Sequence, residues 1–178
     1  MKSRYNIPFR RKLEGKTDYR KRLKLLSSGS RRLVIRKSLK NMTAQVIEFA
    51  PEGDKVLLSA SSRELIKMGW TAPRSNVPAA YLVGLLLASK AKAGKVSGRI
   101  IVDIGLATSV RGSRLYALVR GAIDGGLGIE CSKDILPDDD RVSGKHISEY
   151  SDKRQFKYDA AKLPELFDKV KKQIMGAR

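Results

Sequence analysis

The longest strongly apolar stretch of the sequence, residues 77–88, constrains the fold more than any other feature. It is well short of the roughly 20 apolar residues that a membrane-spanning helix needs, so the sequence predicts no transmembrane segment. Asn76 can cap a helix here, Pro78 fits its first turn, and Gly94 can end it. Because this helix is apolar nearly all round, we expect it to be buried inside a domain.

Strand-forming segments flank the apolar helix on both sides in the sequence. Three segments precede it, at residues 32–37, 43–49 and 56–59, and the turn at residues 51–54 predicts an antiparallel meander. A fourth segment, residues 99–105, is a continuous β-branched run typical of a central strand that is covered on both faces.

Further elements complete an α/β pattern. A capping-box sequence at residues 61–64 begins a helix that stops near Gly69, and apolar residues recur at helical spacing over residues 115–123. Residues 129–131 can form a short last strand. The sequence therefore predicts a globular domain over residues 31–134, a three-layer α/β fold whose mixed sheet has helices on both faces.

Positive charge is concentrated at the start of the chain. Residues 1–40 contain 15 of the 37 Lys and Arg but only Glu14 and Asp18 as acids, which leaves +6 of the net charge of +19 for the other 138 residues. Such a charge needs a polyanion, and nucleic acid is a better candidate than an anionic membrane. We expect residues 1–30 to be a basic arm, mobile when free, in which Asp18 or Thr17 caps a short helix.

The chain after Asp134 changes character. Residues 135–178 begin with a polar stretch, which predicts an extended tail. Apolar residues over 163–174 then fall on one helical face, with Pro164 near the start, so we expect a terminal amphipathic helix. The sequence does not predict what this helix packs against.

The small number of cysteine and histidine residues limits the chemistry of the chain. One cysteine, Cys131, and one histidine, His146, exclude a disulfide framework and a Cys/His zinc cluster made by this chain alone. We expect no cofactor and no small-molecule substrate. Residues 1–12 have no apolar stretch behind their charges, so we expect no secretory signal and a cytoplasmic location. Cys131 is most simply a buried small residue, and Trp70 either contacts a partner or covers the edge of the core.

Two patterns suggest contacts with RNA. The arm interleaves basic residues with Tyr5, Phe9 and Tyr19, whose rings could stack on unpaired bases. The sequence Arg111-Gly112-Ser113-Arg114 lies between a strand and a helix, where backbone amides and two arginines could hold a phosphate. An ordinary strand-to-helix turn explains the second pattern at least as well.

An enzyme is the main alternative to a binding protein. Asp103, at the centre of an apolar strand, resembles a carboxylate of ribonuclease H-like nucleases, which hold two divalent metals. Its partners would have to be Glu64, Asp124 or residues 138–140, and no combination is compelling. We therefore expect no enzyme activity. A non-specific, DNA-compacting basic protein is a further alternative.

Motifs along nearly the whole chain resemble the archaeal form of the large-subunit ribosomal protein of the eighteen family, a 5S rRNA binder. The most specific of them is the Glu-Gly-Lys-Thr-Asp-Tyr-Arg stretch at residues 14–20. The motifs are residues 11–23, 32–38, 44–46, 53–57, 62–65, 69–70, 76–82, 103–106, 112–114 and 141–147. The resemblance implies a ribonuclease H-like α/β domain without catalysis. It also implies binding to 5S rRNA, 23S rRNA and neighbouring ribosomal proteins in the central protuberance of the large subunit.

The resemblance also implies which residues contact RNA. Arg and Lys are expected to clamp phosphates, Tyr19 to stack, and Gly15 to allow a turn or a close backbone approach. The set in the arm is Arg10, Arg11, Lys12, Gly15, Lys16, Thr17, Tyr19, Arg20, Arg22 and Lys24. Outside the arm, Arg36, Lys37 and Lys40 are added, and the phosphate pattern contributes Arg111 and Arg114.

Overall fold

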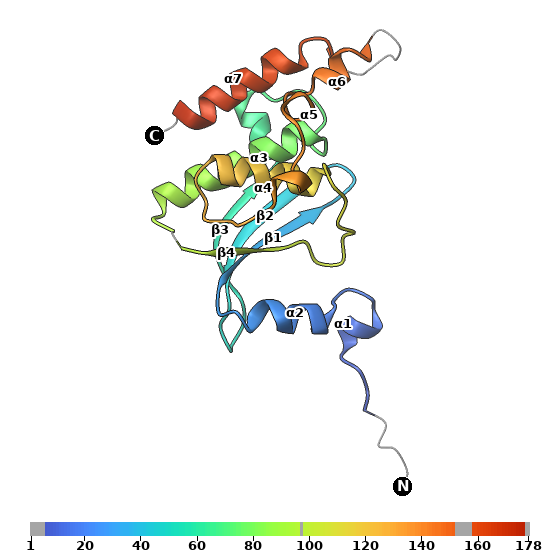
Figure 1. Ribbon diagram of the computed structural model, residues 1–178, viewed down its shortest axis with the longest axis vertical. Coiled ribbons are helices and arrows are strands. Elements are labelled where there is room, and N and C mark those ends of the chain that lie inside the picture. Colours follow the sequence, from blue (N-terminus) through green and yellow to red (C-terminus); the bar gives the residue numbers. More distant parts are fainter. Residues whose placement is uncertain (1–5, 97, 152–157, 177–178) are drawn as a thin grey trace.

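The computed structural model describes residues 6–96, 98–151 and 158–176. Within these residues the chain forms a four-stranded sheet in the order β3-β2-β1-β4 (Figure 1). The antiparallel meander consists of β1 (Arg31–Lys37), β2 (Met42–Glu48) and β3 (Lys55–Ser61), and β4 (Ile100–Asp103) pairs with β1 in parallel. The predicted α/β class and mixed sheet are confirmed.

The apolar stretch forms the central helix of the molecule, α3 (Val77–Ala93). The Asn76 side chain caps it by accepting a hydrogen bond from the backbone N–H of Ala79 at 2.9 Å. The helix is buried along most of its length, between the sheet and the other helices (Figure 1). No helix in the described part of the chain has the length and apolarity to cross a membrane.

Helix α4 (Arg114–Asp124) crosses α3 with direct contact between the two backbones. A Cβ atom added to Gly84 would overlap the carbonyl oxygen of Leu118, and one added to Gly121 would overlap the carbonyl oxygen of Tyr81. The two glycines therefore allow a separation that no larger side chain permits.

The two sides of the sheet are covered differently. Leu33 and Ile35 of β1 belong to the core beneath α3, whereas Arg32 and Val34 are buried on the other side. Helices α1 (Arg10–Leu13) and α2 (Tyr19–Leu26) lie on that second side (Figure 1). Helices are thus present on both sides, but the second layer comes from the N-terminal arm.

Three predicted elements differ from the structure. Residues 129–131 do not form a strand, because the chain leaves the glycine-rich loop after a single parallel bridge between Arg99 and Gly128. The strand predicted to reach residue 105 ends at Asp103, whose carboxylate accepts a hydrogen bond from Gly105 N and helps to turn the chain. The helix predicted from the capping box is a short 3₁₀ helix, η1 (Glu64–Met68).

The tail is helical where the sequence predicted an extended chain. It contains η2 (Lys133–Ile135), α5 (Asp139–Ser143), α6 (Lys145–Ser148) and α7 (Leu163–Gly176), and part of the predicted stretch, residues 152–157, lies outside the described residues. Gly144, in a left-handed conformation with φ +85°, ends α5 and begins α6. Glycine and aspartate are also turn formers, so this part of the sequence gives no clear helical period. The segment predicted as a terminal helix corresponds to α7.

Helix α7 packs against α3. Its buried residues are Leu163, Phe167, Val170 and Ile174. The Phe167 ring lies 5.6 Å from the Tyr81 ring, and the Lys171 ammonium lies 5.5 Å from the centre of the Tyr81 ring. Aromatic and cation–π contacts therefore join the end of the chain to the central helix.

Candidate nucleic-acid interface

The basic arm is folded into two short helices joined by a tight turn. Gly15 has φ +61°, a left-handed conformation that favours glycine, and the amides of Lys16 and Thr17 bind the Arg11 carbonyl at 2.9 and 3.2 Å. Asp18 caps α2 by accepting hydrogen bonds from the N–H groups of Arg20 and Lys21 at 3.0 and 3.1 Å. The cap predicted for Asp18 or Thr17 is therefore made by Asp18.

An arginine–aspartate network anchors the arm to the sheet. It consists of Arg22, Asp54, Arg32, Asp103 and Arg36. One oxygen of Asp54 accepts hydrogen bonds from Arg22 at 2.8 Å and from Arg32 at 2.7 Å. Asp103 pairs with Arg32 at 3.3 Å and with Arg36 at 3.7 Å. Since the Arg32 side chain is only 2% exposed, its guanidinium has lost most of its hydration, and these carboxylates stabilise its charge instead.

Two carboxyl groups in this region are held in their charged form. Burial raises the pKa of Asp54, but the hydrogen bonds from Arg22 and Arg32 outweigh it, so this pKa lies below its ordinary value. Hydrogen bonds from Lys16 and Arg10 lower the pKa of Glu14. Glu14 thus fixes two arm cations, and Asp54 fixes the helix that follows.

A hollow of about 410 Å³ lies between the arm and the sheet. We call it the arm–sheet hollow. Its cationic lining residues are Arg11, Lys16, Lys21, Arg22 and Arg36. The Lys21 ammonium donates a hydrogen bond to the Gly105 carbonyl at 3.0 Å, so it connects the arm to the loop after β4. The hollow gathers five of the cations that the arm and β1 contribute.

Three predicted arm cations are not held by any other described residue. Lys12, Arg20 and Lys24 are exposed, and their side-chain nitrogens make no hydrogen bond or ion pair within residues 6–96, 98–151 and 158–176. By contrast, Arg10 and Lys16 both pair with Glu14, at 2.7 and 2.8 Å. The free cations can therefore meet phosphates without first breaking an internal contact.

The aromatic residues of the arm form a pair. The rings of Phe9 and Tyr19 lie 5.0 Å apart with a tilt of 44°, and Phe9 is largely exposed. Tyr5 lies outside the described residues. The pair offers an apolar ring surface beside the basic helices, which is the type of surface on which unpaired bases stack.

A second group of predicted cations lies at the β1–β2 hairpin. Lys37 and Lys40 flank the hairpin tip and are exposed. The Ser75 hydroxyl donates to the Ser38 carbonyl at 3.0 Å, and Arg114 donates to both the hydroxyl and the carbonyl oxygen of Ser75 at 2.6 Å. Residues far apart in the sequence are thus brought together at this hairpin.

The turn before α4 is occupied by its own chain. Gly112 N donates to the Ile135 carbonyl at 2.9 Å, and Ser113 N donates to the Val110 carbonyl at 3.2 Å. Arg114 is held by Ser75, while Arg111 is exposed. In the described part of the chain, the Arg111 side chain makes no hydrogen bond and is open to solvent, whereas the Ser113 hydroxyl also has no hydrogen-bond partner but is buried. Of the four residues in the predicted phosphate pattern, Arg111 is therefore the one whose side chain is free to meet a phosphate.

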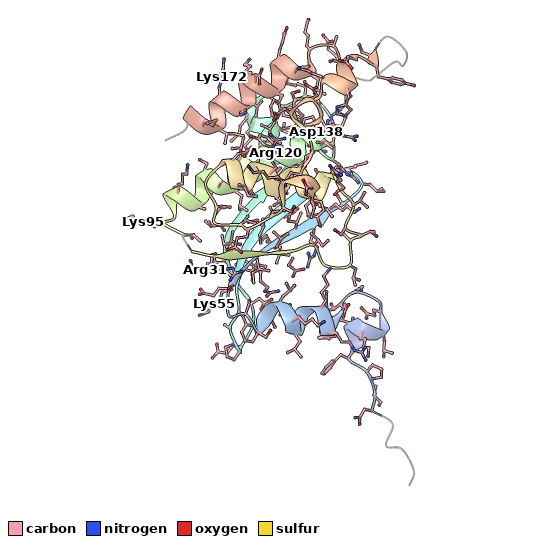
Figure 2. All side chains as sticks on the ribbon, in the orientation of Figure 1. Arg31, Lys55, Lys95, Arg120, Asp138 and Lys172 are labelled. Atoms are coloured by element: carbon pink, nitrogen blue, oxygen red, sulfur yellow. The ribbon has the colours of Figure 1, made fainter. Side chains whose placement is uncertain are left out.

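Three cations near the arm were missed in the sequence. Lys21 lies inside the arm but has no distinctive spacing, and its contact with Gly105 is 84 residues away in the chain. Figure 2 shows Arg31 and Lys55 at the end of the sheet toward the arm, whereas Lys95 and Lys172 lie farther from it. Arg31 and Lys55 could have been found only from the strand pairing, which places the starts of β1 and β3 at one end of the sheet.

The structure does not bring the carboxylates of a nuclease together. Asp103 is engaged by Arg32 and Arg36, Glu64 pairs with Lys90 at 2.6 Å, and Asp124 accepts a hydrogen bond from the Tyr81 hydroxyl at 2.8 Å. Among the described residues, no group of three or more His, Cys, Asp or Glu could hold a metal ion.

Trp70, Cys131 and His146, which were considered from the sequence individually or as possible ligands, lie away from the basic arm. Trp70 is 2% exposed and donates a hydrogen bond from its ring to the Pro73 carbonyl at 3.3 Å, so it covers the core, and the alternative in which Trp70 contacts a partner is wrong. Cys131 is only partly buried rather than buried, and burial raises the pKa of its thiol. His146 lies beside Asn76 and Tyr150 at a small apolar hollow.

An α/β domain that carries a folded cationic arm has the design of a nucleic-acid-binding protein. A family model described as ribosomal large subunit proteins 60S L5 and 50S L18 matches residues 3–96, which is more than half of the chain. The chain belongs to this family of large-subunit ribosomal proteins, as its motifs suggested. The matched region contains the arm, the antiparallel meander and the central helix.

Proposed function

We propose that this large-subunit ribosomal protein binds 5S rRNA through its arm and links it to 23S rRNA and neighbouring proteins in the central protuberance. The observation that carries the proposal is the anchored arm. The arginine–aspartate network fixes α2 on the sheet, while Lys12, Arg20 and Lys24 stay exposed without acidic partners among the described residues. A fixed array of cations loses less conformational entropy on binding than a flexible one.

Each part of the predicted set has a role in this proposal. The free arm cations, together with Arg10, Arg11, Lys16 and Arg22, neutralise phosphates, and Tyr19 stacks with Phe9 on an unpaired base. Thr17 and Gly15 shape the turn between α1 and α2. Lys37, Lys40 and Arg114 form a further basic surface at the hairpin, where Arg36 lies near the end of the same strand as Lys37. The exposed Arg111, in the turn before α4, adds another phosphate contact.

Three finer statements accompany this proposal. We propose that the sheet has the ribonuclease H-like topology, which the order β3-β2-β1-β4 and the bridge between Arg99 and Gly128 beyond β4 support. We propose that the protein is not an enzyme and needs no cofactor. We also propose that it is located in the cytoplasm, on the ribosome, and is of the archaeal type.

Deletion of residues 1–24 tests the role of the arm. We expect the shortened chain to lose 5S rRNA binding in a gel-shift assay, because the cations of α1 and α2 are removed. Thermal unfolding must show that the α/β domain is still folded, since Arg22 also pairs with Asp54. If the folded, shortened chain binds 5S rRNA as tightly as the full chain, the arm is not the binding element.

A nuclease assay separates the enzyme alternative. With magnesium and either 5S rRNA or an RNA–DNA hybrid, we expect no cleavage. Magnesium-dependent cleavage that Asp103→Asn abolishes, in a variant that remains folded, would instead favour the ribonuclease H-like nuclease.

A further inference from the structure

We propose that the arm–sheet hollow receives one unpaired nucleotide of the bound RNA, with its base against the apolar wall and its phosphate among the cations. This inference rests on the proposed RNA-binding function and adds a specific ligand to it. The occupant is a single extruded or bulged nucleotide, not a stretch of duplex backbone.

The size and closure of the hollow fit such a ligand. Its volume of about 410 Å³ lies within the range of about 300–1,000 Å³ that is typical of small-molecule pockets. The contact between Lys21 and the Gly105 carbonyl joins its two walls. Gly105 has φ +62°, and an added Cβ would lie 3.0 Å from the Arg36 guanidinium. A glycine at this position therefore lets the Arg36 side chain pack against the backbone of the loop.

The charges that line the hollow favour an anion. Its two lining carboxylates are already engaged, Asp18 by the first amides of α2 and Asp103 by Arg32 and by Gly105 N. The cations keep unused donors. Lys21 makes one hydrogen bond with its ammonium, and the Nη2 group of Arg36 makes only a 3.7 Å ion pair with Asp103. An ammonium has three donors and a guanidinium five, so a phosphate can bind without displacing these contacts.

The apolar part of the lining distinguishes a nucleotide from a phosphate alone. Leu25, Leu106 and the Tyr19 side chain share the hollow with the cations, and Leu106 is 57% exposed. A backbone phosphate makes no use of such a wall. A base has an apolar face that covers it, and single-strand-binding proteins combine the same two features, a cationic groove and a stacking surface.

The test compares the full chain with Leu106→Ala by gel shift and by acylation of ribose 2′-hydroxyls across 5S rRNA. We expect the wild-type protein to protect at least one unpaired nucleotide, and Leu106→Ala to expose that nucleotide again. The variant should bind about 5–10-fold more weakly, which corresponds to about 1–1.4 kcal/mol. This is the lower part of the range of about 1–3 kcal/mol for a base stacked on an aromatic ring, because Leu106 is aliphatic. Its salt dependence should equal that of the wild type, because no cation is removed.

The matched control is Ile66→Ala, a similarly exposed apolar residue, 52% exposed, that does not line the hollow. We expect wild-type binding and protection from it. The inference is overturned if Leu106→Ala binds and protects like the wild type, or if the wild type protects no unpaired nucleotide; 5S rRNA binding would then still stand. Absence of 5S rRNA binding by the wild type would overturn the proposed function as well.

Discussion

Replacing Asp54 with asparagine should destabilise the whole domain. One oxygen of Asp54 accepts hydrogen bonds from Arg22 at 2.8 Å and from Arg32 at 2.7 Å, and Arg32 is almost completely buried. In Asp54→Asn, Asp103 at 3.3 Å becomes the only carboxylate partner of the Arg32 guanidinium among the described residues.

The size of this effect follows from the geometry. Removal of one partner of a fully buried ion pair costs about 3–5 kcal/mol, and a hydrogen bond to a charged group contributes about 1.5–3 kcal/mol. Because the Asp54 side chain is 23% exposed, we expect a loss of about 2–3 kcal/mol in the free energy of unfolding. For a chain of this length, Tm should fall by about 4–12 °C.

Thermal and urea unfolding at several pH values measure this loss. The pKa of Asp54 in the folded protein lies below its ordinary value of 3.8, so its stabilising effect is complete above that value and is lost as the pH falls through the folded pKa. The difference between wild type and Asp54→Asn should therefore be full at neutral pH and shrink in acid. Asp134→Asn removes the same charge from an exposed residue that has no partner within the described segments, and should leave Tm unchanged. Equal stability of wild type and Asp54→Asn at neutral pH would refute the reasoning.

Two further substitutions test the packing and the free cations. Gly121→Ala should lower the free energy of unfolding by about 1–3 kcal/mol in urea, because the new Cβ overlaps the Tyr81 carbonyl and overpacks the helix crossing. The control is Gly176→Ala, whose new Cβ lies in open space, and it should be neutral or slightly stabilising as helix propensity predicts. A stabilising effect of Gly121→Ala would contradict the close contact between α3 and α4. Glutamine at three arm positions should reduce the slope of log K against log salt for 5S rRNA by about 0.7–0.9 per residue, and an unchanged slope would show that these residues do not meet phosphates. The positions are Lys12, Arg20 and Lys24.

Local signals predicted much of the fold because their physics is local. Asn76, Pro78 and Gly94 set the limits of α3 within the segment itself, and Asp18 caps α2 through amides two and three residues away. The antiparallel meander followed in the same way from its strands and turn. These elements needed no knowledge of the tertiary structure.

Long-range contacts explain what the sequence did not predict. Arg32 was predicted as the first residue of a strand, with no sign that its side chain is buried, yet it is buried because Asp54 and Asp103 reach it from positions 22 and 71 residues away. The arm–sheet hollow depends on the same contacts. Packing against α3 likewise organises the tail, whose short helices have too few residues to show a period.

The central claim is that an anchored cationic arm recognises one structured RNA, and competition binding tests it most directly. Labelled 5S rRNA is bound by the full chain at near-cellular salt and is challenged with unlabelled 5S rRNA, unrelated RNA of equal length and duplex DNA. We predict that only unlabelled 5S rRNA displaces the label at comparable concentration. Equal displacement by all three competitors would contradict the account and favour a non-specific basic protein.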